Sequence, residues 1–285
     1  MPDKLIIENG IVKAMTDEGL TLASGEADLQ AMLAADYTPP LGDVTLPDGV
    51  KIVEWQKPYL VVVHQTSPHV RRLRWIAEDS PREFGPGTKY RSVRLSLPYA
   101  ITFAMYVQYR NALSLTGYNE LYFRNEPLRS RRDLVCFPAL LNISAIHTPT
   151  RTRAWICTEH LSRREGADWT GQLSELLDHT WNGGFNRSSE HHEGASWYGA
   201  SENVHSQLHP VRKWEAATAA DECFGLKVPW KTAPLCAQEI IESMIAECQQ
   251  SSWSSMMHRH PVPSGPASIV QRFVNFVQST GRKAS

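Results

Sequence analysis

The feature that most constrains the fold is a series of segments whose apolar residues follow the repeat of a β-strand. Three such segments are residues 59–64, 70–76 and 90–97. In the last of them Val93 and Leu95 point to one side, and Arg94 and Ser96 point to the other, as in a half-buried strand. The intervening loops are polar and contain Gly and Pro, which favours hairpins over helical crossovers. The sequence therefore predicts an antiparallel β-meander.

In the second half of the chain the apolar spacing changes to that of amphipathic helices. One predicted helix begins after Asp168 and stops at the glycines of residues 183–184. Two more are predicted at residues 240–248 and 269–277, whereas residues 99–109 fit either a strand or a buried helix. The expected fold class is α+β, with helices flanking the antiparallel meander.

Two turn signals near the N-terminus divide the chain. The pairs Asn9-Gly10 and Asp48-Gly49 tolerate the positive φ of tight turns and predict two hairpins, with a short helix between them. We therefore expect three parts along the chain. They are a β-rich N-terminal extension at residues 1–56, an α+β core at residues 57–210 and a helical C-terminal extension at residues 211–285.

Charge and cysteine content narrow the function classes. The chain has 29 basic and 30 acidic residues, so it lacks the positive field of a dedicated nucleic-acid-binding protein. Its five cysteines form no close pair, and no basic segment followed by an apolar run opens the sequence. We therefore expect reduced cysteines and a cytoplasmic protein. The apolar stretch at residues 95–107 is too short to cross a bilayer, so no membrane partner is expected.

Arginines gather in the middle third of the chain. The clusters are Arg71, Arg72 and Arg74; Arg129, Arg131 and Arg132; Arg151 and Arg153; and Arg163 and Arg164. Such clusters are either ordinary solvated charge or a basic face for an acidic partner, and the sequence leaves both interpretations open.

Three short motifs follow the predicted strands. They are Phe137-Pro138-Ala139-Leu140-Leu141-Asn142, then Ala154-Trp155-Ile156-Cys157-Thr158-Glu159-His160-Leu161, and then Asp168-Trp169. A proline-containing stretch, a cysteine segment, a tryptophan and a helix, in this order after a meander, resemble ubiquitin-conjugating enzymes. The runs at residues 97–99 and 121–128 are similar to a divergent bacterial branch, the component B family of the PRTRC gene cluster.

The resemblance implies that an acyl group is carried as a thioester. Cys157 would be the nucleophile, and Asn142 would stabilise the oxyanion that forms when a lysine attacks. Asp168 or Glu159 would help to deprotonate the incoming amine, and His160 would favour the thiolate of the cysteine. The implied partners are a ubiquitin-like protein and a ThiF-like activating enzyme, and no cofactor is expected.

Positive charge near the cysteine is a further expectation. Arg151 and Arg153 precede Cys157 and would add to the potential that lowers the pKa of its thiol. The plainer alternatives are that Cys157 is an inert core residue and that Asn142 is a turn residue. Cys136 is a rival nucleophile. A chain of this fold without catalysis would be an adaptor that binds a protein partner.

A histidine-rich segment offers a different chemistry. His205 and His209 would share one face if this segment is helical, and His191, His192 or Glu193 would supply a third ligand to a metal ion. A polar surface loop is the alternative. The corresponding third function is a metal-binding hydrolase.

Overall fold

In a computed structural model of the chain, the described residues are 4–8, 11–16, 19–24, 46–109, 112–159, 161 and 168–250. The first eight strands are β1 (Lys4–Glu8), β2 (Ile11–Thr16), β3 (Gly19–Ser24), β4 (Val50–Gln56), β5 (Tyr59–Thr66), β6 (His69–Ile76), β7 (Tyr90–Leu97) and β8 (Tyr99–Tyr109). The others are β9 (Ala112–Leu115), β10 (Glu120–Arg124), β11 (Leu134–Cys136), β12 (Ile143–His147), β13 (Thr152–Ile156), β14 (Gly184–Phe185) and β15 (Thr232–Cys236). The helices are α2 (Trp169–Asn182), α3 (Ser188–His192), α4 (Ser201–Val204), α5 (Val211–Ala220), α6 (Phe224–Lys227) and α7 (Ala237–Gln250), with a 3-10 turn η1 at Trp197–Ala200.

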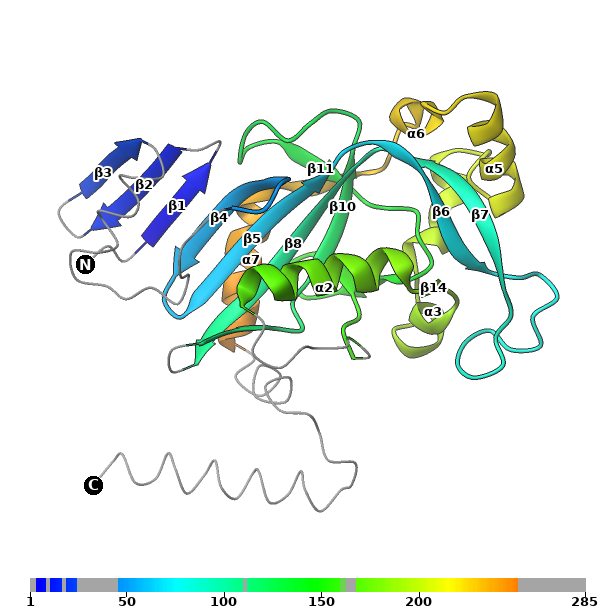
Figure 1. Cartoon of the computed structure of the whole chain (residues 1–285), viewed down its shortest axis with the longest axis horizontal. Coiled ribbons are helices and arrows are strands. Elements are labelled where there is room, and N and C mark those ends of the chain that lie inside the picture. The colour runs from blue at the N-terminus through cyan, green and yellow to red at the C-terminus, as the bar shows by residue number, and fades with distance from the viewer. Residues whose placement is uncertain are drawn as a thin grey trace, which may run out of the picture.

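Twelve of the described strands form one large sheet (Figure 1). Nine of them follow one another in the order β12-β13-β10-β8-β5-β4-β1-β2-β3, while β9 pairs with β8, and β11 joins β10 to β15. Every pair in this sheet is antiparallel. The predicted α+β class with an antiparallel sheet is confirmed, and the ambiguous segment at residues 99–109 is strand β8.

Strands β5 to β8 form one long hairpin that is interrupted in the middle. The β6–β7 pairing ends with His69 facing Leu97, and the β5–β8 pairing resumes in the same register at Thr66. Pro68 and Pro98 therefore face each other at the break, where neither can donate a ladder hydrogen bond. The outer half of the hairpin leaves the large sheet and forms a three-stranded sheet with β14.

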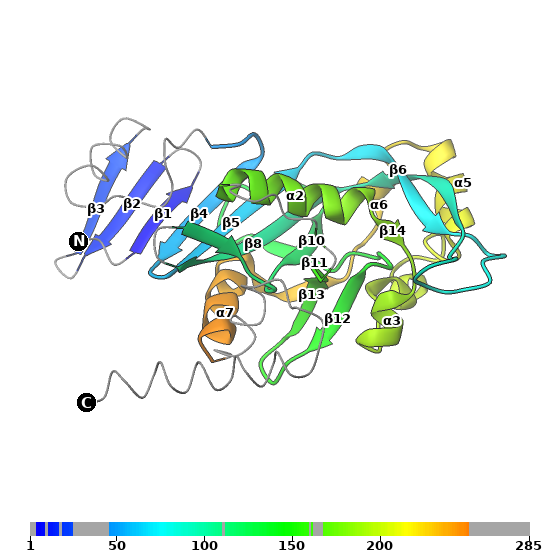
Figure 2. The ribbon, with the colours of Figure 1, turned by 60° about the horizontal axis from the view of Figure 1, so that its bottom comes forward.

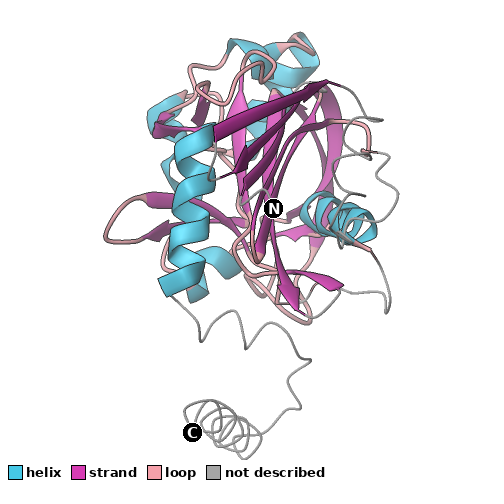
Figure 3. Cartoon of the chain, turned by 90° about the vertical axis from the view of Figure 1, so that its left-hand side faces the viewer, coloured by secondary structure: helices cyan, strands magenta, loops and turns pink. Residues whose placement is uncertain are grey.

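Two long helices cover opposite faces of the large sheet (Figures 2 and 3). Helix α2 buries Leu173, Leu176 and Trp181, which are three of the four residues of the predicted apolar face, and it also buries Trp169 at its start. Helix α7 likewise buries its predicted apolar residues, Ile240, Ile241, Met244, Ile245 and Cys248. The helix predicted at residues 269–277 lies outside the described residues.

The free edge of β7 is covered by helix α5. The Thr218 hydroxyl accepts a hydrogen bond from the Ser96 amide at 2.9 Å, and the Trp214 indole donates to the Ser96 carbonyl at 3.2 Å. The Glu215 carboxylate accepts from the Arg94 amide at 3.4 Å. Because an unpaired edge invites pairing with another chain, these side chains take the place of a neighbouring strand.

The sheet crosses both boundaries that the sequence predicted. Strand β4, before residue 57, pairs with β5, and β15, after residue 210, pairs with β11. The predicted hairpin β1–β2 is confirmed. The second predicted hairpin, at Asp48-Gly49, is not formed. Gly49 has the positive φ of a turn, +86°, but the strand after it, β4, pairs with β1 and β5. Leu46, which the second hairpin would have placed in its first strand, is not in a strand. The short helix predicted between the two hairpins, at residues 29–33, lies outside the described part.

Candidate functional site

Asn142 and Cys157 lie at the same end of one strand pair. Strands β12 and β13 are joined in a register that ends with Ile143 facing Ile156. One position further along each strand lie Asn142 and Cys157. The backbones of Asn142 and Cys157 therefore leave the ladder side by side, at the same end of the hairpin.

The C-terminal turn of α2 holds both residues. The His179 Nε2 donates a hydrogen bond to the Cys157 carbonyl at 2.8 Å, and the Asn142 amide nitrogen donates to the Thr180 carbonyl at 3.0 Å. Two successive residues of one helix thus contact the cysteine and the asparagine. The Cys157 backbone and the Asn142 side chain therefore both lie against the end of α2, independently of the strand register.

Asn142 has hydrogen-bonding capacity left over. Its Nδ2 carries two hydrogens, of which the Thr180 carbonyl takes one, and its Oδ1 is buried with no hydrogen-bond partner. Buried polar atoms without a partner are uncommon in native structures. The side chain is therefore held in place and still able to bind an additional group.

The described charged residues that act on Cys157 are acidic. The cysteine is half-buried, and burial raises the pKa of its thiol. A hydrogen bond from the Glu159 backbone opposes this shift in pKa, and the negative charges of Glu193 and Glu159 add to it. The expectation of a thiol pKa lowered by positive charge is therefore wrong. His160, one of the expected sources of that charge, lies outside the described residues.

Glu193 is a member of this site that the sequence suggested only as a metal ligand. It follows α3 and accepts a hydrogen bond from the hydroxyl of Ser144 in β12 at 3.2 Å. Burial raises the pKa of its carboxyl, and the charge of Glu159 contributes in the same direction. A carboxylate whose pKa is raised is better suited to accept a proton near neutral pH. No local sequence signal links Glu193 to Cys157, because α2 and α3 lie between them in the chain.

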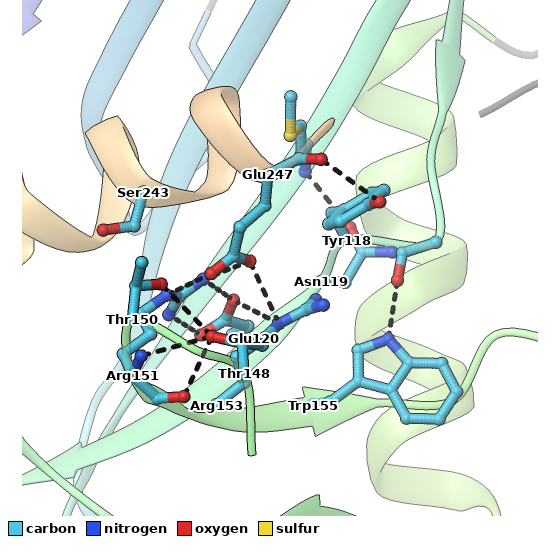
Figure 4. A network of polar contacts seen from close by, with 12 residues as sticks. Tyr118, Asn119, Glu120, Thr148, Thr150, Arg151, Arg153, Trp155, Ser243 and Glu247 are labelled. Carbon is cyan, nitrogen blue, oxygen red and sulfur yellow. Dashed lines mark hydrogen bonds and ion pairs between the residues drawn. The ribbon is translucent and has the colours of Figure 1, made fainter. Parts of the chain in front are cut away.

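The positive charges of Arg151 and Arg153 are not directed at Cys157. Both are buried in a network with Glu120 and Glu247, beneath α7 (Figure 4). Arg151 donates to Glu120 at 2.6 and 2.7 Å and to Glu247 at 2.9 and 3.0 Å, and Arg153 donates to Glu120 at 3.0 Å. Burial alone would raise the pKa of Glu120, but the two arginines lower it to about 2. Their charges are therefore neutralised inside the fold.

Asp168 has a structural role at the other end of α2. Its carboxylate caps the helix by accepting from the Gly171 amide and the Thr170 hydroxyl, each at 2.8 Å. Eleven residues separate it from His179, which is about 16 Å along a helix. Asp168 is therefore too far from Cys157 to act on a substrate there.

The four histidines proposed as metal ligands do not form one cluster, because they pack against three different aromatic residues. His191 and His192 pack against Phe84, with ring centroids 4.5 and 5.2 Å away. Helix α4 ends at Val204, so His205 and His209 do not share a helical face; they pack against Phe224 and Tyr198 respectively. Within the described ranges, no three His, Cys, Asp or Glu side chains are placed to hold a metal ion.

Cys136 remains in the sheet, as expected of a residue before the proline stretch. It faces Phe123 of β10 and is half-buried, and burial raises the pKa of its thiol. Unlike Cys157, it has no asparagine at the facing position.

Comparison with protein-family models, curated proteins and solved structures found no match. None of the helices in the described part of the chain has the length and apolar character needed to cross a membrane.

The thiol environment predicts an order of alkylation. The thiolate is the reactive form, so a half-buried Cys157 whose pKa is raised should react with iodoacetamide at pH 7.5 more slowly than the exposed Cys223. Its rate should keep rising as the pH passes 9, the ordinary value for a thiol. Mass spectrometry of the tryptic peptide at residues 154–163 follows this reaction. Faster alkylation of Cys157 than of Cys223 at pH 7.5 would contradict the described environment.

Proposed function

We propose that this chain transfers an acyl group from a thioester to an amine through Cys157. The observation that carries the proposal is that Asn142 and Cys157 lie at the same end of the β12–β13 ladder and that both contact the last turn of α2. A nucleophilic thiol next to an oriented amide donor is what thioester chemistry needs. Glu193 adds a carboxylate to the same site.

The reaction has two steps. The Cys157 thiolate attacks the donor thioester, and the donor thiolate leaves as the new thioester forms. An amine then attacks this thioester, and the free N–H of Asn142 stabilises the oxyanion. Glu193 takes the proton of the amine as the Cys157 thiolate leaves and the amide bond forms. Acidic residues around the cysteine also attract a cationic lysine to it.

The raised thiol pKa is compatible with this role. The intrinsic nucleophilicity of a thiolate increases with its pKa, which partly offsets the smaller thiolate fraction. A cysteine hydrolase of the thiolate–imidazolium type fits less well. In that class a histidine pairs with the thiol, whereas the described histidine in contact with Cys157, His179, has its Nε2 bonded to the backbone carbonyl of the cysteine.

The donor proposed is a ubiquitin-like protein loaded by a ThiF-like activating enzyme, on a core like that of ubiquitin-conjugating enzymes. Four neighbouring antiparallel strands, β4, β5, β8 and β10, precede the Cys157 hairpin, and α2 follows it. This order supports the resemblance that the motifs indicated.

The alternative is an adaptor on the same fold that binds a protein partner without catalysis. The burial and raised pKa of the Cys157 thiol favour this second candidate. Under it, removal of the thiol would leave partner binding intact and no acyl transfer would occur at any cysteine.

A small donor tests the proposal without the natural partners. We expect a peptide thioester ending in Gly-Gly, mixed with excess lysine amide, to yield peptide amide faster with the chain than without it. A Cys157→Ala variant should lose this acceleration, and Cys223→Ala should retain it because Cys223 is exposed and remote from Asn142 in sequence. Equal rates for the wild type and Cys157→Ala would reject the proposed chemistry.

A further inference from the structure

The outer half of the long hairpin carries three exposed arginines on one face. Arg72 and Arg74 lie on β6, and Arg94 lies on β7, whereas Leu73 and Val93 on the opposite face are buried. Figure 1 shows this ribbon of β6 and β7 at the end of the molecule, with α5 beside it. We call this exposed side, with Arg72, Arg74 and Arg94, the arginine face.

Two of these arginines oppose each other directly. Arg72 faces Arg94 across the two strands, and like charges in this position destabilise a strand pair. Within the described residues the Arg94 side chain pairs with Glu222 at 3.4 Å, in an exposed ion pair whose side chains are 59% and 74% accessible. The Arg72 side chain makes no hydrogen bond or ion pair with a described residue. An additional negative charge placed between Arg72 and Arg94 would therefore reduce the repulsion between them.

The backbone beneath the arginine face is held on both edges. Strand β14 pairs with β6, where Gly184 faces Arg74, and α5 covers the edge of β7. Tyr90 is fixed by a hydrogen bond from Asn186 to its hydroxyl at 2.8 Å, and the Arg74 guanidinium lies over its ring at 5.0 Å. A Cβ on Gly184 would lie 2.5 Å from the Tyr90 ring, so the glycine permits this packing. The backbone that carries the three arginines is thus fixed before any partner binds.

A hollow of about 490 Å³ opens beside Arg72 and Arg94. It is lined by Arg72, Ser92 and Arg94 of the ribbon and by Glu215, Thr218, Ala219 and Glu222 of α5 and the loop after it. Glu215 is already paired with Arg91 at 2.6 Å. The two glutamates on this wall repel the evenly spaced charges of a nucleic acid, whereas a peptide can place its carboxylates beside the arginines and away from the glutamates.

We propose that the arginine face binds an acidic segment of a partner protein in extended conformation. One carboxylate lies between Arg72 and Arg94, and a second lies beside Arg74. Arg72 and Arg74 are two residues apart on a strand, which is about 7 Å, the spacing of alternate side chains in an extended peptide. The partner segment therefore has Asp or Glu at every second position. This inference does not depend on Cys157 chemistry.

Fluorescence anisotropy with the full chain tests this binding. The probes are a fluorescein-labelled peptide of alternating Glu and Ser, its Gln and Ser counterpart, and a single-stranded oligonucleotide of the same charge as the first. We expect the Glu peptide to bind, and Arg72→Thr and Arg94→Thr each to weaken it by about fivefold. The matched control is Arg132→Thr, which removes an exposed arginine elsewhere and should leave affinity unchanged.

A stability measurement separates binding from folding. Arg72→Thr removes the facing like charge and places a β-branched residue in a strand, so its thermal midpoint should stay the same or rise by about 1 to 2 °C. Weaker binding by a variant of unchanged or higher midpoint supports the proposal. Absence of Glu-peptide binding, equal binding of the Gln peptide, or unchanged affinity in Arg72→Thr would overturn it. Tighter binding of the oligonucleotide, lost in the same variants, would overturn it in favour of nucleic acid.

Discussion

Replacing Glu120 with glutamine is expected to lower the free energy of unfolding by about 3 to 5 kcal/mol. Glu120 is fully buried and accepts hydrogen bonds from Arg151, Arg153 and the Tyr122 hydroxyl. The neutral variant leaves the two buried arginines with Glu247 as their carboxylate partner, and removing one member of a buried ion-pair network has a cost of this size. Urea unfolding followed by tryptophan fluorescence measures the change.

The matched control is Asp79→Asn. Asp79 pairs with Lys89 at 3.5 Å, and both side chains are mostly exposed, so this variant should lose less than about 1 kcal/mol. Equal losses in the two variants would show that the buried network does not stabilise the fold as described.

The same network predicts how acid acts on stability. The arginines lower the pKa of Glu120 from 4.5 to about 2, so its contribution is complete above pH 4.5 and is lost as the pH falls toward 2. Wild-type stability should therefore decline across this window more steeply than that of Glu120→Gln, which has no carboxyl to protonate at this position.

Replacing Asn142 with alanine is expected to slow amide formation from the Cys157 thioester by about 100-fold or more. Loss of one oriented donor to an oxyanion has effects of this order in acyl-transfer enzymes. The variant also loses the hydrogen bond to the Thr180 carbonyl, which is worth about 1 kcal/mol of stability. Single-turnover assays on pre-acylated protein isolate this step from loading.

Asn125→Ala is the control for that stability loss. Asn125 makes the same kind of bond, from its Nδ2 to the Val228 carbonyl at 2.9 Å, and belongs to a different loop. It should lose similar stability without a change in transfer rate. A slowing of less than threefold in Asn142→Ala would remove Asn142 from the mechanism.

Local patterns were sufficient to predict the β1–β2 hairpin, the strands β5, β6 and β7 and the helices α2 and α7. The alternation in β6 and β7 and the apolar faces of α2 and α7 are set by residues close in sequence, and the structure has all four elements. Pairing between segments that are distant in sequence could not be predicted from local patterns. Nothing near Thr232 or Leu134 indicates that β15 pairs with β11, because such pairs depend on how the whole chain packs.

The candidate site shows the same limit. The positions of Cys157 and Asn142 were found from motif order, and their proximity follows from a hairpin that closes between them. The charge that the described residues place around Cys157 was predicted with the wrong sign. Arg151 and Arg153 are near Cys157 in sequence, but β13 directs them toward Glu120. Glu193, whose charge acts on Cys157, follows α2 and α3 in the chain. Distance along the chain was a poor guide to electrostatic potential at the thiol.

The most direct test of the proposed chemistry is the mass of the tryptic peptide at residues 154–163 after brief exposure of the protein to the Gly-Gly peptide thioester. The proposed function predicts that this peptide gains the mass of the acyl group, that neutral hydroxylamine removes it, and that added lysine amide discharges it more slowly in Asn142→Ala. An unmodified Cys157 peptide, with the acyl group on another cysteine or on none, would contradict the assignment of Cys157 as the carrier.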